Sequence, residues 1–193
     1  MRRYGFATGL VDFGPDSTGS VVRSSSLEWL VTNGIGGYAC GTVAGILTRR
    51  WHGLLAAATD PPAGRTLMLA KLDPLIVYKG TAHDLANNRF KGGVVNAPGL
   101  PYLIRFHLEQ LVPTWTWCIR DALIEQRIFM KQGENTTFVH WRFVQGSSDL
   151  RLRLGALACC RPHSRLTPPG SPGPTIEQAD RGVRVSWAPR DGS

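Results

Sequence analysis

Short runs of apolar residues recur along most of the chain, and clusters of Gly, Pro, Asn and Asp separate them. Residues 114–117 alternate between Thr and Trp, which is typical of a half-buried strand. Residues 150–154 place leucines on one face and arginines on the other, so we expect a leucine face in the core and an arginine face toward solvent or another domain. The pattern predicts strands at residues 27–32, 51–59, 66–72, 75–78, 102–108, 114–117, 122–130, 136–144, 150–154 and 182–187.

Turn signals indicate how these runs connect. Residues 60–64 include two prolines and a glycine and predict a turn, and Asp73-Pro74 predicts another between two strands. Residues 131–135 predict the loop of a hairpin. The polar stretch 79–101 is long enough to be a functional or inserted loop. Many short strands without a long helix predict an all-β fold, an antiparallel β-sandwich.

The two ends of the chain differ from its middle. Residues 1–25 are punctuated by Gly, Ser and Asp, so we expect an irregular segment there. Residues 26–193 then make up the predicted sandwich domain. Within it, the prolines and glycines of 167–174 can hold neither a ladder nor a helix and predict a flexible, linker-like connection.

Composition narrows the class of protein. The 193 residues are 42% hydrophobic and 19% charged, which is typical of a soluble domain with its own core. We expect no membrane partner, because apolar runs of about 18 residues do not occur. The N-terminus lacks the apolar stretch of a secretory signal, so we expect a cytoplasmic protein. The net charge is +8, but the arginines are dispersed, so we expect no nucleic-acid partner.

The four cysteines are Cys40, Cys118, Cys159 and Cys160. Their spacing fits neither a zinc site nor a disulfide framework, and we expect buried free thiols. His83, His107, His140 and His163 show no ligand spacing either. We therefore expect no metal and no cofactor.

A glycine-rich stretch supplies the clearest candidate for chemistry. Asn33, Gly36, Gly37 and Tyr38 lie in a turn that follows an apolar run, where glycines permit close backbone approach. The stretch then reaches residues 48–53, which combine arginine forks, a flat indole ring and an imidazole. This mixture suits a polar, planar ligand or a contact between domains. The binding candidates are Asn33, Gly36, Gly37, Tyr38, Arg49, Arg50, Trp51 and His52.

Residues 34–39 also match the dinucleotide-binding fingerprint G-x-G-x-x-[GA]. That motif needs a helix directly after it, and Gly41, Thr42, Val43 and Gly45 are poor helix formers. An alternating βαβ pattern is also missing downstream. We therefore interpret the glycines as a tight connection between strands.

The same stretch resembles the opening motif of the bacterial and archaeal glycogen debranching enzymes, the amylo-α-1,6-glucosidases. The motif stands here as EWLVTNGIGGYACGT at residues 28–42 and TRRWHGLL at 48–55. Trp51 replaces the family's usual Tyr, and Pro162 stands where Asp or Tyr is expected. Further similar pieces keep their order, so that the resemblance spans about residues 26–166: 61–65, 113–117, 124–130, 135–137 and 161–164.

The resemblance implies an N-terminal β-sandwich, supersandwich-like and apparently truncated, that precedes a catalytic (α/α)6 barrel. That barrel holds the family's active site and is not within these 193 residues. The implied partners are an α-glucan, glycogen or limit dextrin, and the barrel of the same polypeptide. We expect the fragment alone to be inactive.

The carboxylates agree with this expectation. Glycoside hydrolysis uses two carboxyl groups that flank the scissile bond, and no such pair stands out, so we assign no catalytic residue. Asp60 and Asp73 precede prolines and are explained by turns. The candidates considered are Glu28, Asp60, Asp73, Glu109 and Glu125, of which Glu28 could instead pair with Arg49 or Arg50.

Several alternatives stay open at the level of sequence. Trp115 and Trp117 share one strand face and could stack on a sugar, although core packing is the more frequent explanation. His52 could bind a sugar or be a structural histidine. Besides the debranching-enzyme domain, the chain could be a stand-alone carbohydrate-binding module or a structural domain without a ligand.

Overall fold

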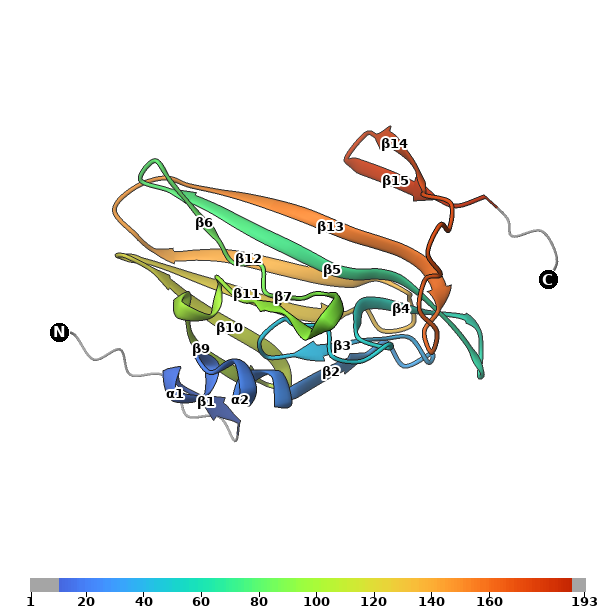
Figure 1. Cartoon of the computed structure of the whole chain (residues 1–193), viewed down its shortest axis with the longest axis horizontal. Coiled ribbons are helices and arrows are strands. Elements are labelled where there is room, and N and C mark those ends of the chain that lie inside the picture. Colours follow the sequence, from blue (N-terminus) through green and yellow to red (C-terminus); the bar gives the residue numbers. More distant parts are fainter. Residues whose placement is uncertain (1–10, 189–193) are drawn as a thin grey trace.

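The computed structural model describes residues 11–188, which form two large antiparallel sheets with helices confined to short segments (Figure 1). Sheet A has the order β1-β9-β10-β11-β12, and sheet B has the order β13-β5-β4-β3-β2 with β6 beside β5. The predicted all-β, antiparallel, sandwich-like fold is confirmed. The strands of sheet A are β1 (Asp12–Phe13), β9 (Leu103–Glu109), β10 (Val112–Ile119), β11 (Ala122–Met130) and β12 (Thr137–Gln145).

Sheet B is built largely from the first half of the chain. Its strands are β2 (Glu28–Thr32), β3 (Tyr38–Thr42), β4 (Gly53–Asp60), β5 (Gly64–Tyr78), β6 (Thr81–Asp84) and β13 (Leu150–Pro162). Two small hairpins pair β7 (Asn88–Arg89) with β8 (Val95–Asn96), and β14 (Thr175–Ala179) with β15 (Gly182–Ser186). The helical elements are α1 (Pro15–Thr18), α2 (Val21–Ser26), η1 (Lys91–Gly93) and η2 (Leu100–Tyr102). No helix within residues 11–188 has the length and apolar composition to span a bilayer.

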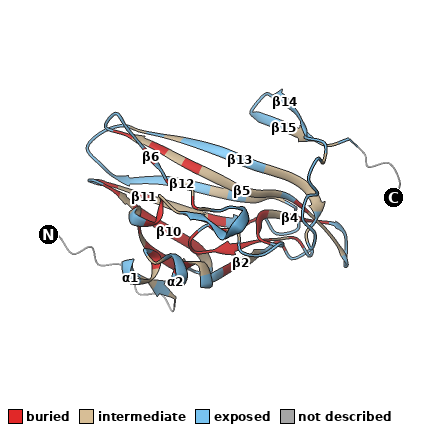
Figure 2. Ribbon diagram, viewed as in Figure 1, coloured by how far each residue is buried: buried red, intermediate tan, exposed pale blue. Residues whose placement is uncertain are grey.

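The core lies between the two sheets, where β2 and β3 pack on β10 and β11 (Figure 2). Its centre is aromatic: the ring of Trp115 meets Trp29 edge to face at 5.4 Å and Phe106 at 5.0 Å between centroids. Trp115 and Trp117 are each only 4% exposed, so core packing, not a sugar platform, explains them. Because Thr114 and Thr116 are buried too, the expectation of a half-buried strand is wrong for β10.

The predicted turn at Asp73-Pro74 is also wrong, because β5 runs through it. A proline removes one backbone donor, which normally interrupts a central strand. Here the ladder with β4 ends at Leu69 and the ladder with β6 begins at Leu75. Pro74 therefore lies in the gap between two neighbours, where the missing N–H breaks no bond on that side.

Residues 79–101 are not a bare loop. They hold β6, β7, β8, η1 and the start of η2, and β6 pairs with β5. The buried amine of Lys71 donates to Asn87 O at 2.5 Å and to Asn88 Oδ1 at 2.8 Å, and it pairs with Asp73 at 2.7 Å. Asn87 in turn donates to Ala44 O at 2.8 Å. A network of buried polar contacts thus fixes this segment to sheet B.

An irregular segment was expected for residues 1–25, and this expectation is wrong for residues 11–25, which the structure describes. Residues 1–10 lie outside the described residues, but β1, α1 and most of α2 fall within 11–25. Ser20 caps α2 by accepting a hydrogen bond from Arg23 N, and Thr18 donates to Leu103 O at 2.6 Å. Single side-chain bonds of this kind stabilise helices too short for periodicity to reveal.

Candidate functional site

The candidate stretch lies in sheet B, in the two connections that precede and follow β3. Residues 33–37 are the turn of the β2–β3 hairpin, which confirms a strand connection in place of a dinucleotide-binding loop. Residues 48–52 form the loop that enters β4. The eight predicted binding residues therefore occupy two neighbouring loops and the start of β3.

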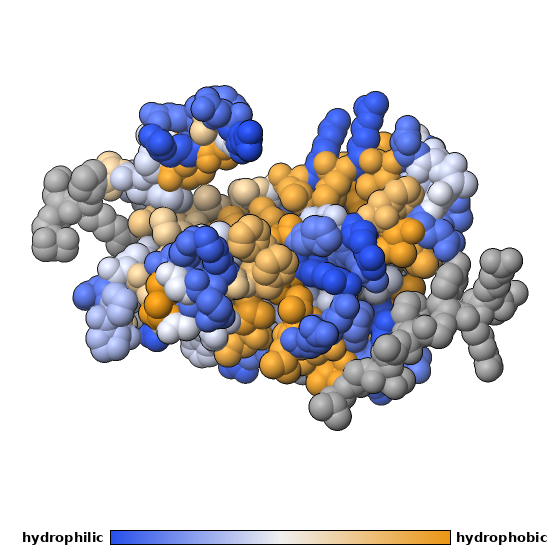
Figure 3. Space-filling view, turned by 180° about the vertical axis from the view of Figure 1, so that it is seen from behind, coloured by the Kyte–Doolittle hydropathy of each residue, from blue (hydrophilic) through white to orange (hydrophobic). Residues whose placement is uncertain are grey.

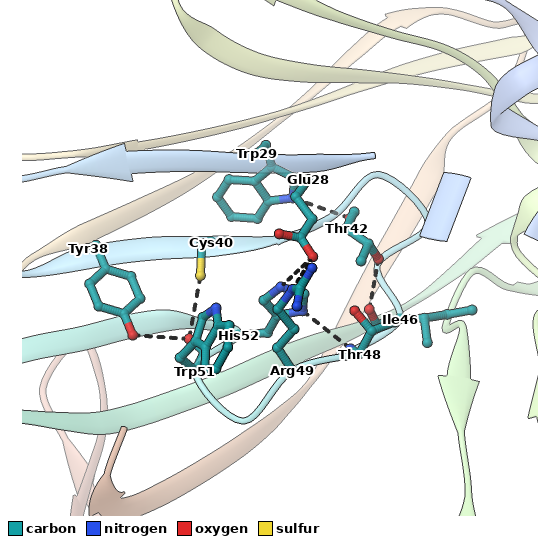
Figure 4. Close-up of polar contacts among 10 residues, drawn as sticks. All are labelled: Glu28, Trp29, Tyr38, Cys40, Thr42, Ile46, Thr48, Arg49, Trp51 and His52. Carbon is teal, nitrogen blue, oxygen red and sulfur yellow. Dashed lines mark hydrogen bonds and ion pairs between the residues drawn. The ribbon is translucent and has the colours of Figure 1, made fainter. Parts of the chain in front are cut away.

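The side chains of Glu28, Arg49 and His52 meet beside the 48–52 loop (Figure 4). Arg49 Nε donates to Glu28 Oε1 at 2.5 Å, and His52 Nε2 lies 3.5 Å from the same oxygen. Arg49 and Glu28 are 49% and 37% exposed, so their ion pair is a surface contact and adds little stability. The pairing considered for Glu28 is thus present, with Arg49 as its partner.

His52 is a structural histidine by its surroundings, since its side chain is 1% exposed. Its Nδ1 accepts the backbone N–H of Thr48 at 3.3 Å, which leaves the ring proton on Nε2, toward Glu28. Burial lowers the pKa of His52, and the cation of Arg49 lowers it further, against the opposing effect of Glu28. The ring is therefore neutral at pH 7 and fixes the entry to β4.

This lowered pKa predicts a pH-dependent stability. The unfolded chain binds a proton at His52 below about pH 6.5, while the folded chain resists it, so the free energy of unfolding falls as pH drops below that value. In urea denaturation, we expect the free energy of unfolding to fall less between pH 7.5 and 5.5 for His52→Asn than for the unsubstituted protein. The amide oxygen of the asparagine can replace Nδ1 as acceptor. Parallel losses in the two proteins would contradict this assignment. Burial also lowers the pKa values of His107 and His163, so these two residues should keep part of the pH dependence of the free energy of unfolding in the variant.

Arg50 and Trp51 have the opposite character, because their side chains face solvent. Trp51 is 44% exposed, and the guanidinium carbon of Arg49 lies 5.5 Å from its ring centroid. Among residues 11–188, the Arg50 side chain has no hydrogen-bond or ion-pair partner, and it is exposed. The 48–52 loop therefore carries, at consecutive positions, a guanidinium without a partner among residues 11–188 and an exposed indole ring.

The backbone beneath these two side chains is held in place. Trp51 O accepts the Tyr38 hydroxyl at 3.3 Å and the Cys40 thiol at 3.4 Å. Burial raises the pKa of Tyr38 to about 12 and that of Cys40 to about 11, so both remain protonated donors at neutral pH. Tyr38 Oη also lies 2.8 Å from His163 Nδ1.

Arg161, near the end of β13, fixes the loop from the other side. Its Nη2 donates to Arg50 O at 2.8 Å, while its Nη1 bonds the carbonyls of Pro162, His163 and Arg165. One guanidinium thus joins the turn after β13 to the 48–52 loop. Its side chain is occupied structurally, which distinguishes it from Arg50.

Asn33 and Gly37 form the turn itself. Asn33 is fully buried, and its Oδ1 accepts the backbone N–H groups of Ile35 and Gly37 at 3.1 and 2.8 Å. Its Nδ2 donates to Glu134 O and Asn135 Oδ1, both at 3.0 Å. All of these partners belong to the protein, so Asn33 joins the β2–β3 turn to the loop between β11 and β12.

Asn135 completes this connection. Its amide exchanges two hydrogen bonds with the backbone of Ala58 in β4, at 2.9 and 3.0 Å. Gly36 has φ +98°, a conformation that favours glycine, and its carbonyl accepts Arg65 Nε at 2.6 Å. These contacts, the staple between the sheets, join the β2–β3 turn and the β11–β12 loop to β4 near its last residues.

Of the other carboxylates considered, Asp73, Glu109 and Glu125 are ion-paired, and Asp60 is the last residue of β4. Glu109 and Glu125 both contact Arg127, at 2.5 and 3.5 Å, and Glu125 also pairs with Arg142 at 2.6 Å. Asp73 pairs with Lys71. Within residues 11–188, no group of three or more His, Cys, Asp or Glu is arranged to share a metal ion. All four cysteines are free thiols, but Cys40 alone is buried; the other three are half-buried, which corrects the expectation for them.

Comparison with known protein families matches residues 27–192 to the glycogen debranching enzyme N-terminal domain. The chain belongs to this family. No curated protein and no solved structure gave a match to the chain. The debranching-enzyme match covers both loops of the candidate site as well as the strands that hold them. The resemblance drawn from the sequence motifs is therefore confirmed at the level of the family.

Sequence reasoning about this debranching-enzyme domain missed the groups that organise the site. Arg161, His163 and Asn135 stood out only as family-like pieces, and Arg65 was noted without a partner. Their contacts with the candidate loops join residues 29 to 125 positions apart along the chain. The sequence offered one signal for these residues, the density of polar side chains in 161–164 and 135–137. That density does not show which residues they contact in the fold.

Proposed function

We propose that this chain is the non-catalytic N-terminal β-sandwich of a glycogen debranching enzyme, which packs on the catalytic barrel and helps to bind branched α-glucan. The observation that carries the proposal is the pair of exposed side chains, Arg50 and Trp51, on a loop whose backbone is fixed. The carbonyls of both residues are hydrogen-bonded, so little conformational entropy remains to be lost when a ligand binds.

The chemistry of the pair suits a glucan. A sugar ring presents C–H groups that pack on the indole face, and its hydroxyl oxygens accept hydrogen bonds from a guanidinium. Arg49 lies over the Trp51 ring and adds a cation–π contact to this surface. Tyr38 anchors the Trp51 carbonyl, and Asn33, Gly36 and Gly37 form the turn that leads into Tyr38. His52 positions the loop from below.

Substitution of the two exposed residues in the full-length enzyme tests the proposal. We expect Trp51→Ala and Arg50→Ala, made singly, to lower kcat/KM on a limit dextrin by about 10-fold to 100-fold, which is about 1–3 kcal/mol. The melting temperature should hardly change, because exposed side chains contribute little to stability. Arg181→Ala, an exposed arginine in the β14–β15 turn, is the matched control.

The outcomes separate the candidate roles. Loss of kcat/KM together with loss of glycogen co-sedimentation by the variant enzyme supports a glucan contact. Early melting with normal kcat/KM would show a structural loop and contradict the proposal. Glycogen retention by the isolated chain, without any kinetic effect in the enzyme, would favour a stand-alone carbohydrate-binding module.

A further inference from the structure

Strand β13 carries an unusual free edge. It is 13 residues long and pairs with β5 along one side, while no strand within residues 11–188 pairs with its other side. Long, unprotected edge strands expose a row of backbone N–H and C=O groups that can hydrogen-bond another strand. The edge is therefore competent for pairing.

The inward face of β13 is apolar but incompletely covered. Leu150 and Leu152 pair in register with Tyr78 and Ile76, which are fully buried, so this face points into the sandwich. Leu154, two residues further along, is nevertheless 42% exposed. The leucine face therefore only partly enters the core, which corrects the expectation for residues 150–154. Figure 3 shows hydrophobic surface along the upper edge of the molecule, where β13 lies.

The outward face of the same segment is basic. Arg151 and Arg153 alternate with the leucines and are exposed. Neither guanidinium has an ion-pair or hydrogen-bond partner among the described residues. Hydrophilic side chains project from the hydrophobic surface along this edge in Figure 3. Two unpaired positive charges therefore flank the exposed backbone edge.

We propose that the free edge of β13 at residues 150–154 binds an extended strand in which apolar and acidic residues alternate. Its backbone would extend sheet B, and its apolar side chains would cover the exposed leucine face. Its carboxylates would lie beside Arg151 and Arg153, where opposite charges on neighbouring strands stabilise the pair. The same arginines discourage pairing with a basic strand, which makes the site selective.

A second copy of this chain fits the edge poorly. Antiparallel pairing of two β13 strands about Leu152 would place Arg151 of one copy opposite Arg153 of the other, twice. Like charges directly opposite each other destabilise a strand pair. Charge complementarity therefore points to an acidic partner strand and not to self-association.

Two synthetic peptides of equal length test the site, one alternating Val with Glu and one alternating Val with Lys. We expect fluorescence anisotropy to show at least tenfold tighter binding of the Val–Glu peptide, with slowed amide hydrogen exchange in β13 on binding. The double variant Arg151→Glu/Arg153→Glu should reverse this preference. Both substituted side chains are exposed and unpaired, and unchanged melting would show that the variant folds.

A Val–Glu peptide with every backbone amide N-methylated provides the control for backbone pairing. It retains the charges but cannot donate to the edge, so we expect its binding to be lost. Equal binding of the methylated and unmodified peptides would reduce the effect to charge attraction and overturn the proposal. Absence of binding by either peptide, protection confined to other strands, or concentration-dependent dimerisation through β13 would overturn it too.

Discussion

Replacement of Trp115 by alanine is expected to lower the free energy of unfolding by about 3–5 kcal/mol. The side chain is 4% exposed and contacts two other aromatic rings, so its removal leaves a large cavity between the sheets. Its Nε1 also donates to Val43 O at 2.9 Å, and that carbonyl would lose its partner. Because whole domains are stable by only about 5–15 kcal/mol, urea denaturation should show a marked shift of the midpoint.

Two variants provide controls for this result. Trp115→Phe retains one aromatic ring but removes the pyrrole ring and its N–H, and we expect an intermediate loss of about 1–3 kcal/mol in the free energy of unfolding. Trp51→Ala removes an exposed indole and should change stability by less than about 0.5 kcal/mol. A loss for Trp115→Ala no greater than that for Trp51→Ala would show that Trp115 does not organise the core.

Replacement of Gly37 by alanine is expected to cost about 2–4 kcal/mol, because it would break one or two buried hydrogen bonds. A Cβ at this position would overlap Asn33 Nδ2 and lie 2.7 Å from Asn135 Oδ1. Those two atoms are the hydrogen-bonded pair that joins the β2–β3 turn to the β11–β12 loop. The added methyl group therefore displaces the staple between the sheets.

Gly173→Ala is the matched control, since a Cβ there would meet no atom within 4 Å. Equal stability of the Gly37 and Gly173 variants would contradict the packing argument. A double-mutant cycle adds a test of mechanism: if Gly37→Ala acts through Asn135, then Gly37→Ala and Asn135→Ala should destabilise less together than the sum of their separate effects. Full additivity would assign the cost of Gly37→Ala to other contacts.

The staple links fold stability to the proposed glucan surface. Asn135 bonds β4 at Ala58, and β4 begins directly after the loop that carries Arg50 and Trp51. We therefore expect Gly37→Ala in the full-length enzyme to lower both the melting temperature and kcat/KM, whereas Trp51→Ala should lower kcat/KM alone. This contrast separates a positioning effect from a direct contact.

The sequence by itself determined the elements with local signals. The β11–β12 hairpin follows from two β-rich runs around a glycine-containing loop, and the β2–β3 connection follows from Asn and Gly at the turn. The family was also accessible, because the motifs at residues 28–42 and 48–55 keep their residues and order. Each of these signals resides in neighbouring residues.

Tertiary structure alone decided the rest. Pro74 stays within a strand because its neighbours on one side change at that point, and β10 is buried on both faces because of what surrounds it. Arg49 and Arg50 are adjacent and chemically alike, yet Arg49 pairs with Glu28, while the exposed Arg50 side chain has no partner within residues 11–188. Periodicity reports which face of a strand is apolar. Which residues meet across 100 or more positions depends on sheet register and stacking, and these place Asn135 beside Asn33 and Arg161 beside Arg50.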